Sequence, residues 1–449
     1  MARPSRLSGF PEWLPEGRLV ELAVLDTAQR IFELHGFSSL ETRSVEPVDV
    51  LLSKGEIDKE VYSVRRIHDD EAAEGALALH FDLTVPFARY VVENAGHLDF
   101  PLRRYQMQKV WRGERPQEGR FREFTQADID IVDLNELAPQ HEAEMAIVMA
   151  EVFAALPFLP PVQIRVNNRK ILEGFYAGLH ISDTAAVFRA VDKIDKIGAD
   201  RVRDLLCGEA GLTDAQAASV LALAQIRARD DSFVHEVRTL GISNPVLDRG
   251  LNELAAVMTA TEGRQAGVVM ADLHIVRGLD YYTGTVYETF LEGYEEFGSI
   301  CSGGRYDSLA TDGKTTYPGV GMSLGVTRLV SLLLGRGLVQ ATRKVPTAVL
   351  VAVIDEDSRA MSDAVAGSLR ARGIACEVAP RAAKFGKQIK YADRRGIPFV
   401  WFPAGVDDEG DSVKDIRTGD QVPADAGVWS PPDTDLRPHI VAASDEGAP

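Results

Sequence analysis

The chain has 449 residues, enough for two to four domains, and 45% of them are hydrophobic, which excludes wholesale disorder. No run approaches the roughly 18–20 apolar residues of a membrane span, and no apolar signal-peptide core follows the first residues, so we expect no membrane association. The three cysteines are too widely spaced for a disulfide framework or a Cys-x-x-Cys zinc site, which fits the cytoplasm. The net charge of −18 argues against nucleic-acid binding but says nothing about local basic patches.

The first predicted element is an amphipathic helix over about residues 19–35, closed by Gly36 in the expected C-cap place. Strand-like and turn-like pieces then continue to about residue 133. Within them, residues 81–86 by themselves look like a plain strand end.

Residues 101–125 are locally basic, with seven basic residues against three acidic ones. This excess indicates an anionic ligand or a solvated strand face that acids nearby balance. A strand, a charged loop with Pro116 and Gly119, and the alternating strand at 128–132 suit a hairpin that wraps a nucleotide triphosphate. Arg112 would reach a phosphate through two hydrogen bonds, and Glu114 could accept from an adenine amino group. The alternative is a structural hairpin held by salt bridges.

The middle of the chain is predicted to be largely helical. A helix with an apolar stripe from Met145 to Leu156 ends before Pro157 and is expected to lie in the core. Residues from about 170 to 260 are charge-rich and mostly helical, and strand patterns resume near Gly267. This stretch therefore looks like a helical insertion inside a β-rich domain.

Residues 277–284 read RGLDYYTG and place a cation, a carboxylate and two phenols between glycines. The flanking residues 272–276 and 285–290 are predicted to be strands, with Gly284 as a break. The Arg277 guanidinium can hold a carboxylate or phosphate, and Tyr281 and Tyr282 can wall a small polar ligand. The stretch indicates a pocket for a small zwitterion that meets an anion; the alternative is a β-hairpin with core tyrosines and a surface arginine.

The last third begins with a glycine-rich strand at residues 319–325 that leads into a helix starting near Arg328. After a linker at residues 336–346, the order strand–helix–strand–helix–strand predicts a small α/β domain with partly parallel strands. Lys384, Lys387 and Lys390 repeat every three residues on one helix side, as a phosphate-facing edge or as a merely solvated face. The tail after about Pro431 is expected to be loose.

In this order, the motifs resemble those of the histidyl-tRNA synthetase family over about residues 8–430. Residues 277–282 and 299–307 are similar to its two histidine signatures, and residues 112–124 and 319–329 to motifs 2 and 3 of class II aminoacyl-tRNA synthetases. Residues 19–42 resemble motif 1, which builds the dimer, although Arg43 stands where the family often has Pro. Residues 384–393 and 413–419 look like the anticodon-binding domain.

The resemblance implies an α+β fold, in which a class II synthetase antiparallel sheet is flanked by helices, with a helical insertion and a C-terminal α/β anticodon-binding domain. The implied boundaries are residues 1–168 and 261–335 for the catalytic domain, 169–260 for the insertion and 345–430 for the anticodon-binding domain. The resemblance also implies a cytoplasmic homodimer that uses histidine, ATP and tRNA(His). ATP would be a substrate accompanied by Mg²⁺, with no organic cofactor and no metal ligands on the protein.

The implied chemistry is attack of the histidine carboxylate on the ATP α-phosphate, followed by transfer of the histidyl group to the 3′-terminal ribose of tRNA. Arg112 and Arg277 would be the catalytic residues, which hold the α-phosphate and the carboxylate. Gln126 and Asp130 would bind the α-ammonium. The imidazole would contact Asp82, Thr84, Tyr281 and Tyr282, with Leu83 in the same segment as Asp82 and Thr84. ATP would contact Glu114, Arg120 and Arg328.

Two other functions are compatible with such a fold. One is the synthetase-like regulatory subunit of ATP phosphoribosyltransferase, which typically lacks the C-terminal domain and loses active-site motifs that this chain keeps. The other is an RNA-binding or signalling module without catalysis, against which Arg112, Arg277 and Arg328 argue. The chain has no Gly-x-x-x-x-Gly-Lys phosphate loop, no Gly-x-Ser-x-Gly elbow and no His/Cys cluster with zinc spacing.

Overall fold

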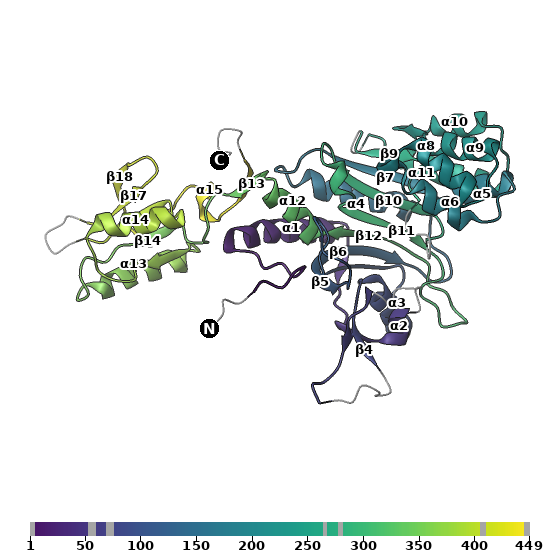
Figure 1. Cartoon of the computed structure of the whole chain (residues 1–449). Helices are drawn as coiled ribbons and strands as arrows, with labels where there is room; N and C mark the ends of the chain where they lie inside the picture. The colour runs from purple at the N-terminus through teal and green to yellow at the C-terminus, as the bar shows by residue number, and fades with distance from the viewer. Residues whose placement is uncertain are drawn as a thin grey trace. The chain divides into compact units, whose positions relative to one another are not determined.

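The computed structural model describes residues 5–52, 60–68, 76–263, 267–276, 282–404 and 410–443 (Figure 1). The chain forms two compact units. The first is mainly Val24–Leu332, and the second is mainly Leu333–Pro449 together with Glu12–Ala23. None of the described helices is long and apolar enough to cross a membrane.

The first unit is built on a mixed nine-stranded sheet with the order β1-β5-β6-β12-β11-β10-β7-β9-β8. Neighbouring strands are antiparallel except for the pairs β1–β5 and β7–β9, which are parallel. The strands are β1 (Ser38–Ser39), β5 (Leu102–Trp111), β6 (Glu123–Val132), β7 (Val162–Asn168), β8 (Arg227–Ala228), β9 (Val269–Asp272), β10 (Thr285–Leu291), β11 (Cys301–Tyr306) and β12 (Gly319–Gly325). This arrangement confirms the predicted α+β class, with a sheet that is mostly but not wholly antiparallel.

The predicted hairpin is formed by β5 and β6, which pair along their whole length from Leu102 with Val132 to Trp111 with Glu123. Helix α1 (Pro15–Leu34) ends where expected, because Gly36 adopts a left-handed φ of 76° and its N–H donates to the Glu33 carbonyl. Helix α4 (Gln140–Ala154) ends before Pro157, also as predicted, and packs against β7 and β12.

Helices dominate residues 169–261, as predicted, but a short strand interrupts them. The helices are α5 (Arg169–Gly178), α6 (Thr184–Val191), α7 (Ile194–Ile197), α8 (Ala199–Gly208), α9 (Asp214–Ala224), α10 (Phe233–Thr239) and α11 (Pro245–Thr261). Their starts follow from capping residues: Asn168 and Asn244 accept backbone N–H bonds, and Thr213 with Gln216 forms a capping box. Strand β8 pairs with β9 and so extends the main sheet, which the charge-rich helical pattern did not indicate.

A small second sheet, with the order β2-β4-β3, lies in the first unit. Its elements are β2 (Val45–Pro47), α2 (Val48–Leu52), β3 (Ser63–Val64) and β4 (Leu77–Leu79), and α3 (Thr84–Asn94) follows with the 3₁₀ turn η2 (Ala95–His97). Arg43, at the position where the related family often has Pro, donates to the fully buried Glu46 at 2.9 Å, and Arg89 donates to the same carboxylate at 2.7 Å. The arginine therefore helps to neutralise a buried acid.

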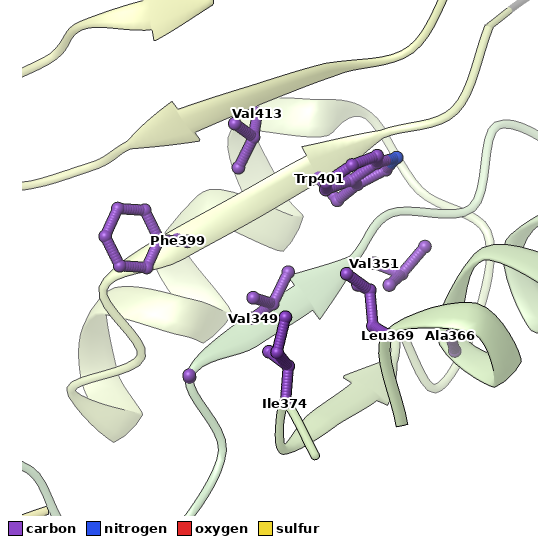
Figure 2. Close-up of a cluster of buried hydrophobic side chains, with 9 residues drawn as sticks. Val349, Val351, Ala366, Leu369, Ile374, Phe399, Trp401 and Val413 are labelled. Atoms are coloured by element: carbon purple, nitrogen blue, oxygen red, sulfur yellow. The ribbon is translucent and has the colours of Figure 1, made fainter. Parts of the chain in front are cut away.

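The second unit contains the predicted α/β domain. Strands β15 (Cys376–Val378), β14 (Val349–Val351) and β16 (Phe399–Phe402) are parallel, and β17 (Ser412–Asp415) and β18 (Gln421–Pro423) continue the sheet antiparallel. Helix α13 is Arg359–Ala371 and helix α14 is Phe385–Arg395. Figure 2 shows the core on one side of this sheet, with Val349, Val351, Phe399, Trp401 and Val413 from the strands and Ala366 and Leu369 from α13.

The expectation of a loose tail after Pro431 is wrong. Helix α15 (Asp433–Leu436) and strand β19 (Ile440–Ala442) follow, and β19 pairs with β13 (Val339–Ala341), inside the segment predicted to be a linker. Before them, the Trp429 ring packs edge-on against Trp401, and Arg372 donates to the carbonyls of Ala426 and Val428. Pairing with β13 holds β19, and the Trp429 and Arg372 contacts hold the residues just before Pro431.

Candidate active site

A polar cleft of about 850 Å³, part of it open to solvent, lies over the middle of the main sheet. Its walls come from the β5–β6 hairpin, from β11 with the residues before it, and from the junction between β12 and α12 (Val326–Gly335). The strands β6, β12 and β11 are neighbours in the sheet, although about 170 residues separate β6 from β11 in the chain. The lining residues include Arg112, Glu114, Arg120, Gln126, Ser299, Cys301, Ser302, Ser323 and Arg328.

The cleft brings together Arg112, Arg120 and Arg328, the three arginines that the family resemblance assigns to ATP binding. Arg112 lies over the Phe124 ring at 5.1 Å and donates from Nε to the Phe81 carbonyl at 3.0 Å. Arg328 lies over the Phe297 ring at 5.3 Å and donates to the Phe297 carbonyl. Packing on rings and backbone anchors both guanidinium groups at the cleft wall.

Arg120 and Glu114 form an ion pair across the turn of the hairpin, with 3.1 Å between Nη1 and Oε2. Both side chains line the cleft, and the Arg120 side chain keeps 48% of its surface exposed. All four residues predicted to hold ATP therefore share one cleft, and Glu114 is the carboxylate among its described lining residues.

A smaller cavity of about 230 Å³ adjoins this cleft, because Ser302 and Ser323 line both. Its floor is bare backbone. A Cβ atom at Gly321 would come within 2.1 Å of Asp130 Oδ1, and one at Gly304 within 2.8 Å of the Tyr282 ring. The lining residues are Thr84, Asp128, Asp130, Tyr282, Ser302, Gly303, Gly304, Tyr306, Gly321, Met322 and Ser323.

Asp130 is one of the predicted histidine-binding residues and is almost fully buried in this cavity. Arg104 Nη2 lies 2.7 Å from Asp130 Oδ2, and the Tyr306 hydroxyl donates to Asp130 Oδ1 at 2.7 Å. The Arg104 guanidinium packs over the Phe87 ring at 4.3 Å. The carboxylate is thus fixed in place before any ligand binds. Gln126 lies four residues before Asp130 on the same face of β6, and its Nε2 donates to Ser323 Oγ at 2.7 Å.

Residues 81–86 form a helix start and not the expected strand end, since β4 stops at Leu79 and α3 begins at Thr84. The Asp82 Oδ1 atom accepts the Val85 N–H at 3.1 Å and thereby satisfies a backbone donor in the first turn. Of the predicted histidine-binding residues here, Thr84 lines the small cavity, whereas the Leu83 side chain is fully buried and its backbone carbonyl faces Arg104.

The segment that follows β9 differs from the prediction in two ways. Strand β9 ends at Asp272, so residues 273–276 are not strand, and β9 and β10 both pair with β7 and not with each other. Arg277 and Tyr281 lie outside the described residues. Tyr282 lines the small cavity, and beyond it Thr283 donates to Asp307 Oδ2 at 2.6 Å.

Sequence reasoning missed Asp128, which lines the small cavity and is 2% exposed. Burial raises the pKa of Asp128 to about 7, although the Arg104 charge and a hydrogen bond with Ser323 oppose the rise. Strand alternation could have found this residue, because Gln126, Asp128 and Asp130 must share one face of β6.

A partly buried charged cluster, also missed, lies at the end of β9. His274 is 3.0 Å from Asp272 Oδ1 through Nδ1 and 3.1 Å from Asp195 Oδ2 through Nε2, and Arg227 reaches Asp272 at 3.0 Å. Burial by itself lowers the pKa of His274, but the two carboxylates outweigh it and raise the pKa to about 9. The protonated ring ties α7 to the chain just before residue 277.

Comparisons with known proteins agree with this architecture. The family model for histidyl-tRNA synthetase matches residues 9–329, and the model for an anticodon-binding domain matches residues 348–409. The histidine–tRNA ligase of Cutibacterium acnes is 58% identical over 98% of this chain and 99% of its own, and that of Micrococcus luteus is 58% identical over 99% and 100%.

Among solved structures, the histidyl-tRNA synthetase of Nostoc sp. PCC 7120 superimposes with a TM-score of 0.85 at 36% identity, over 95% of this chain and 98% of that chain. A Bacillus halodurans protein, described as an ATP phosphoribosyltransferase regulatory subunit/histidyl-tRNA synthetase, shares the fold at 18% identity, with a TM-score of 0.71 over 86% of this chain and 96% of its own. By the family match and by these full-length relatives, the chain belongs to the histidyl-tRNA synthetase family, whose reaction is the ATP-dependent ligation of histidine to tRNA.

Proposed function

We propose that this chain performs both steps of that reaction at the two adjoining cavities, with ATP in the arginine-lined cleft and histidine in the small carboxylate-lined cavity. The observation that supports the proposal is the shared wall of Ser302 and Ser323: the arginine-lined cleft, which suits an anion, adjoins the carboxylate-lined cavity, which suits a cationic group. A histidine ammonium in the small cavity would direct its carboxylate toward the cleft, where the α-phosphate would lie.

In the ATP cleft, Arg112 would hold the α-phosphate and Arg328 the γ-phosphate, since both guanidinium groups are anchored in the cleft wall. Glu114 would accept from the adenine amino group, with Arg120 beside it. Mg²⁺ would enter with ATP and be held mainly by phosphate oxygens, because Glu114 is the carboxylate among the described lining residues and is already paired with Arg120. The ion would add positive charge at the phosphates.

In the small cavity, Gln126 and Asp130 would bind the α-ammonium, and Asp82, Thr84, Tyr281 and Tyr282 would select the imidazole. Thr84, Asp130 and Tyr282 line this cavity, and Gln126 lines the neighbouring cleft. A buried acid left unpaired by an apolar amino acid costs free energy, which disfavours wrong substrates.

The reaction requires no nucleophile from the enzyme, because the histidine carboxylate attacks the phosphorus itself. Catalysis then depends on positioning and on stabilising charge at the α-phosphate, the role of Arg112 and Arg277. Replacing Arg277 with Ala is expected to lower the rate of adenylate formation by roughly 10²–10³, the loss typical of one charge-stabilising donor. A rate of histidine-dependent ATP–pyrophosphate exchange equal to the unaltered enzyme's would remove Arg277 from the mechanism.

The tRNA would contact both units. The α/β domain at residues 345–430 would bind the anticodon arm through Lys384, Lys387 and Lys390, which are all exposed at the start of α14 and along it. The helical insertion at residues 169–260 would meet the acceptor arm. Residues 1–168 and 261–335 would form the catalytic domain of a cytoplasmic homodimer.

The first experiment is ATP–pyrophosphate exchange with each of the twenty amino acids and Mg²⁺, followed by charging of tRNA(His). Exchange with histidine alone is the expected result. Absence of exchange with any amino acid would contradict the proposal and favour a regulatory role, for which the fold shared with the Bacillus halodurans protein is the relevant precedent.

A further inference from the structure

Two buried acceptors beside the wall that the cleft and the small cavity share lack a hydrogen-bond partner among the described residues. They are Gln126 Oε1, whose side chain lines the cleft, and Asp128 Oδ1, whose side chain lines the small cavity. Both side chains are more than nine-tenths buried, and both belong to the same face of β6. A buried acceptor without a hydrogen bond costs about 1–3 kcal/mol, so such groups usually have a ligand or water partner.

The hydrogen bonds around Ser323 determine which side-chain oxygens of Gln126 and Asp128 can still accept a hydrogen bond. Gln126 Nε2 donates to Ser323 Oγ at 2.7 Å, so the amide oxygen is turned the other way. The Ser323 hydroxyl has a single hydrogen, which serves its hydrogen bond with the Asp128 carboxylate. Ser323 lies opposite Asp128 in the β12–β6 pairing, so this relay is built into the register. One oxygen on each side chain therefore remains available to a ligand.

The charges around Asp128 favour a cationic ligand. Arg104 on β5 attracts it, whereas Asp130 on β6 and Asp82 before α3 repel it. Arg104 is already bound to Asp130 at 2.7 Å. Two further neighbours add no charge: burial raises the pKa of Cys301 on β11 above its usual value and lowers the pKa of His80 beside Asp82. Of the described charged groups that act on Asp128, two carboxylates repel it and one guanidinium attracts it, and a proton on Asp128 relieves the repulsion.

We propose that Asp128 is a further substrate-binding residue, whose open carboxylate oxygen accepts one N–H of the histidine α-ammonium beside Gln126 and Asp130. An ammonium group has three donors, and these three side chains follow one another on the same strand face as three acceptors. The ammonium takes the place of the Asp128 proton, which leaves to solvent. This inference rests on the proposed location of histidine in the small cavity.

Because the pKa of Asp128 is about 7 in the empty cavity, about half of the molecules hold its proton at pH 7. Histidine binding at pH 7 is then expected to release about half a proton more from the unaltered enzyme than from Asp128→Asn. The release is measured from the binding enthalpy of histidine in buffers with different heats of ionisation. The comparison between the two proteins removes any proton that comes from the histidine imidazole.

In pyrophosphate exchange, Asp128→Asn is expected to raise the KM for histidine about 10–100-fold, the loss of one hydrogen bond to a charged group, and to leave the KM for ATP unchanged. The matched control is Asp204→Asn, at an exposed position of α8. An unchanged ATP KM also reports that the variant is folded.

The outcomes separate this inference from the proposed function. If the unaltered enzyme exchanges pyrophosphate with histidine but Asp128→Asn has the same histidine KM and the same proton release, Asp128 does not bind substrate. If the unaltered enzyme releases no proton on binding histidine between pH 6 and 8, the inference fails without any variant. If it catalyses no histidine-dependent exchange at all, the proposed function fails first.

Discussion

Raising the pH is expected to weaken the attachment of α7 to the end of β9, because this attachment depends on a protonated His274. The ring lies between Asp195 and Asp272, with Arg227 and Arg165 as the facing cations. The pKa of His274 is raised from 6.5 to about 9 in the folded protein. Its contribution to stability is therefore complete below pH 6.5 and is lost as the pH rises through 9.

The size of this contribution follows from the shift. At 1.36 kcal/mol per pH unit, the full shift corresponds to roughly 3 kcal/mol. Asp195 is 58% exposed, so water screens part of its attraction and roughly 1–3 kcal/mol is the working expectation. The pKa values of Asp195 and Asp272 are lowered, so their contributions are lost only in acid and stay constant above neutrality.

The measurement is thermal unfolding of the full chain and of His274→Gln at pH 6.5 and at pH 9.5. At pH 6.5 the variant is expected to unfold several degrees below the unaltered protein, since 1 kcal/mol corresponds to about 2–4 °C in proteins of 150–250 residues. At pH 9.5 the two melting temperatures should approach each other. Groups other than His274 that titrate at alkaline pH affect both proteins equally, so their effect cancels in the difference between the two melting temperatures. A difference that is the same at both pH values would refute the reasoning.

Three further predictions concern other parts of the molecule. Gly321→Ala should raise the KM for histidine by about 10²-fold in pyrophosphate exchange, because its Cβ would displace Asp130 from its present position; an unchanged KM would exclude Asp130 from binding. Lys387→Glu should slow charging of tRNA(His) and reduce its salt dependence, with pyrophosphate exchange unaffected; equal charging would place the tRNA elsewhere. Trp429→Ala should destabilise the second unit by about 1–3 kcal/mol in urea unfolding, because its contacts with Phe399 and Trp401 are lost; an unchanged midpoint would show that these ring contacts add no stability.

Local signals predicted the elements well where one residue sets a boundary. Gly36 ends its helix with a positive φ, and the alternation in residues 128–132 correctly identified β6. Each of these features depends on neighbours within a few residues, which the sequence displays directly.

Long-range pairing was beyond such signals. Strand β9 pairs with β7, about 100 residues earlier, and β19 pairs with β13 across a similar distance. The side-chain pattern of a strand does not indicate which distant strand it pairs with. In the cleft, Arg112 and Glu114 were singled out because charged side chains in a loop with Pro and Gly are conspicuous, whereas Arg120 and Arg328 came from the family resemblance. That these four residues bind ATP stays a prediction. Asp128 and His274 were missed because their properties come from burial and from carboxylates on other strands.

The strand order has a consequence for synthesis on the ribosome. The β5–β6 hairpin is complete once residue 132 has emerged, but the free edge of β6 waits for β12, which ends at Gly325. Strands β10, β11 and β12 must then enter between β6 and β7, two strands made much earlier. An open edge that persists for about 190 residues of translation invites pairing with other chains. The edge of β6 is therefore open while the helices α5–α11 are being made, and the small cavity, which residues of β11 and β12 line, cannot be complete before β12 has emerged.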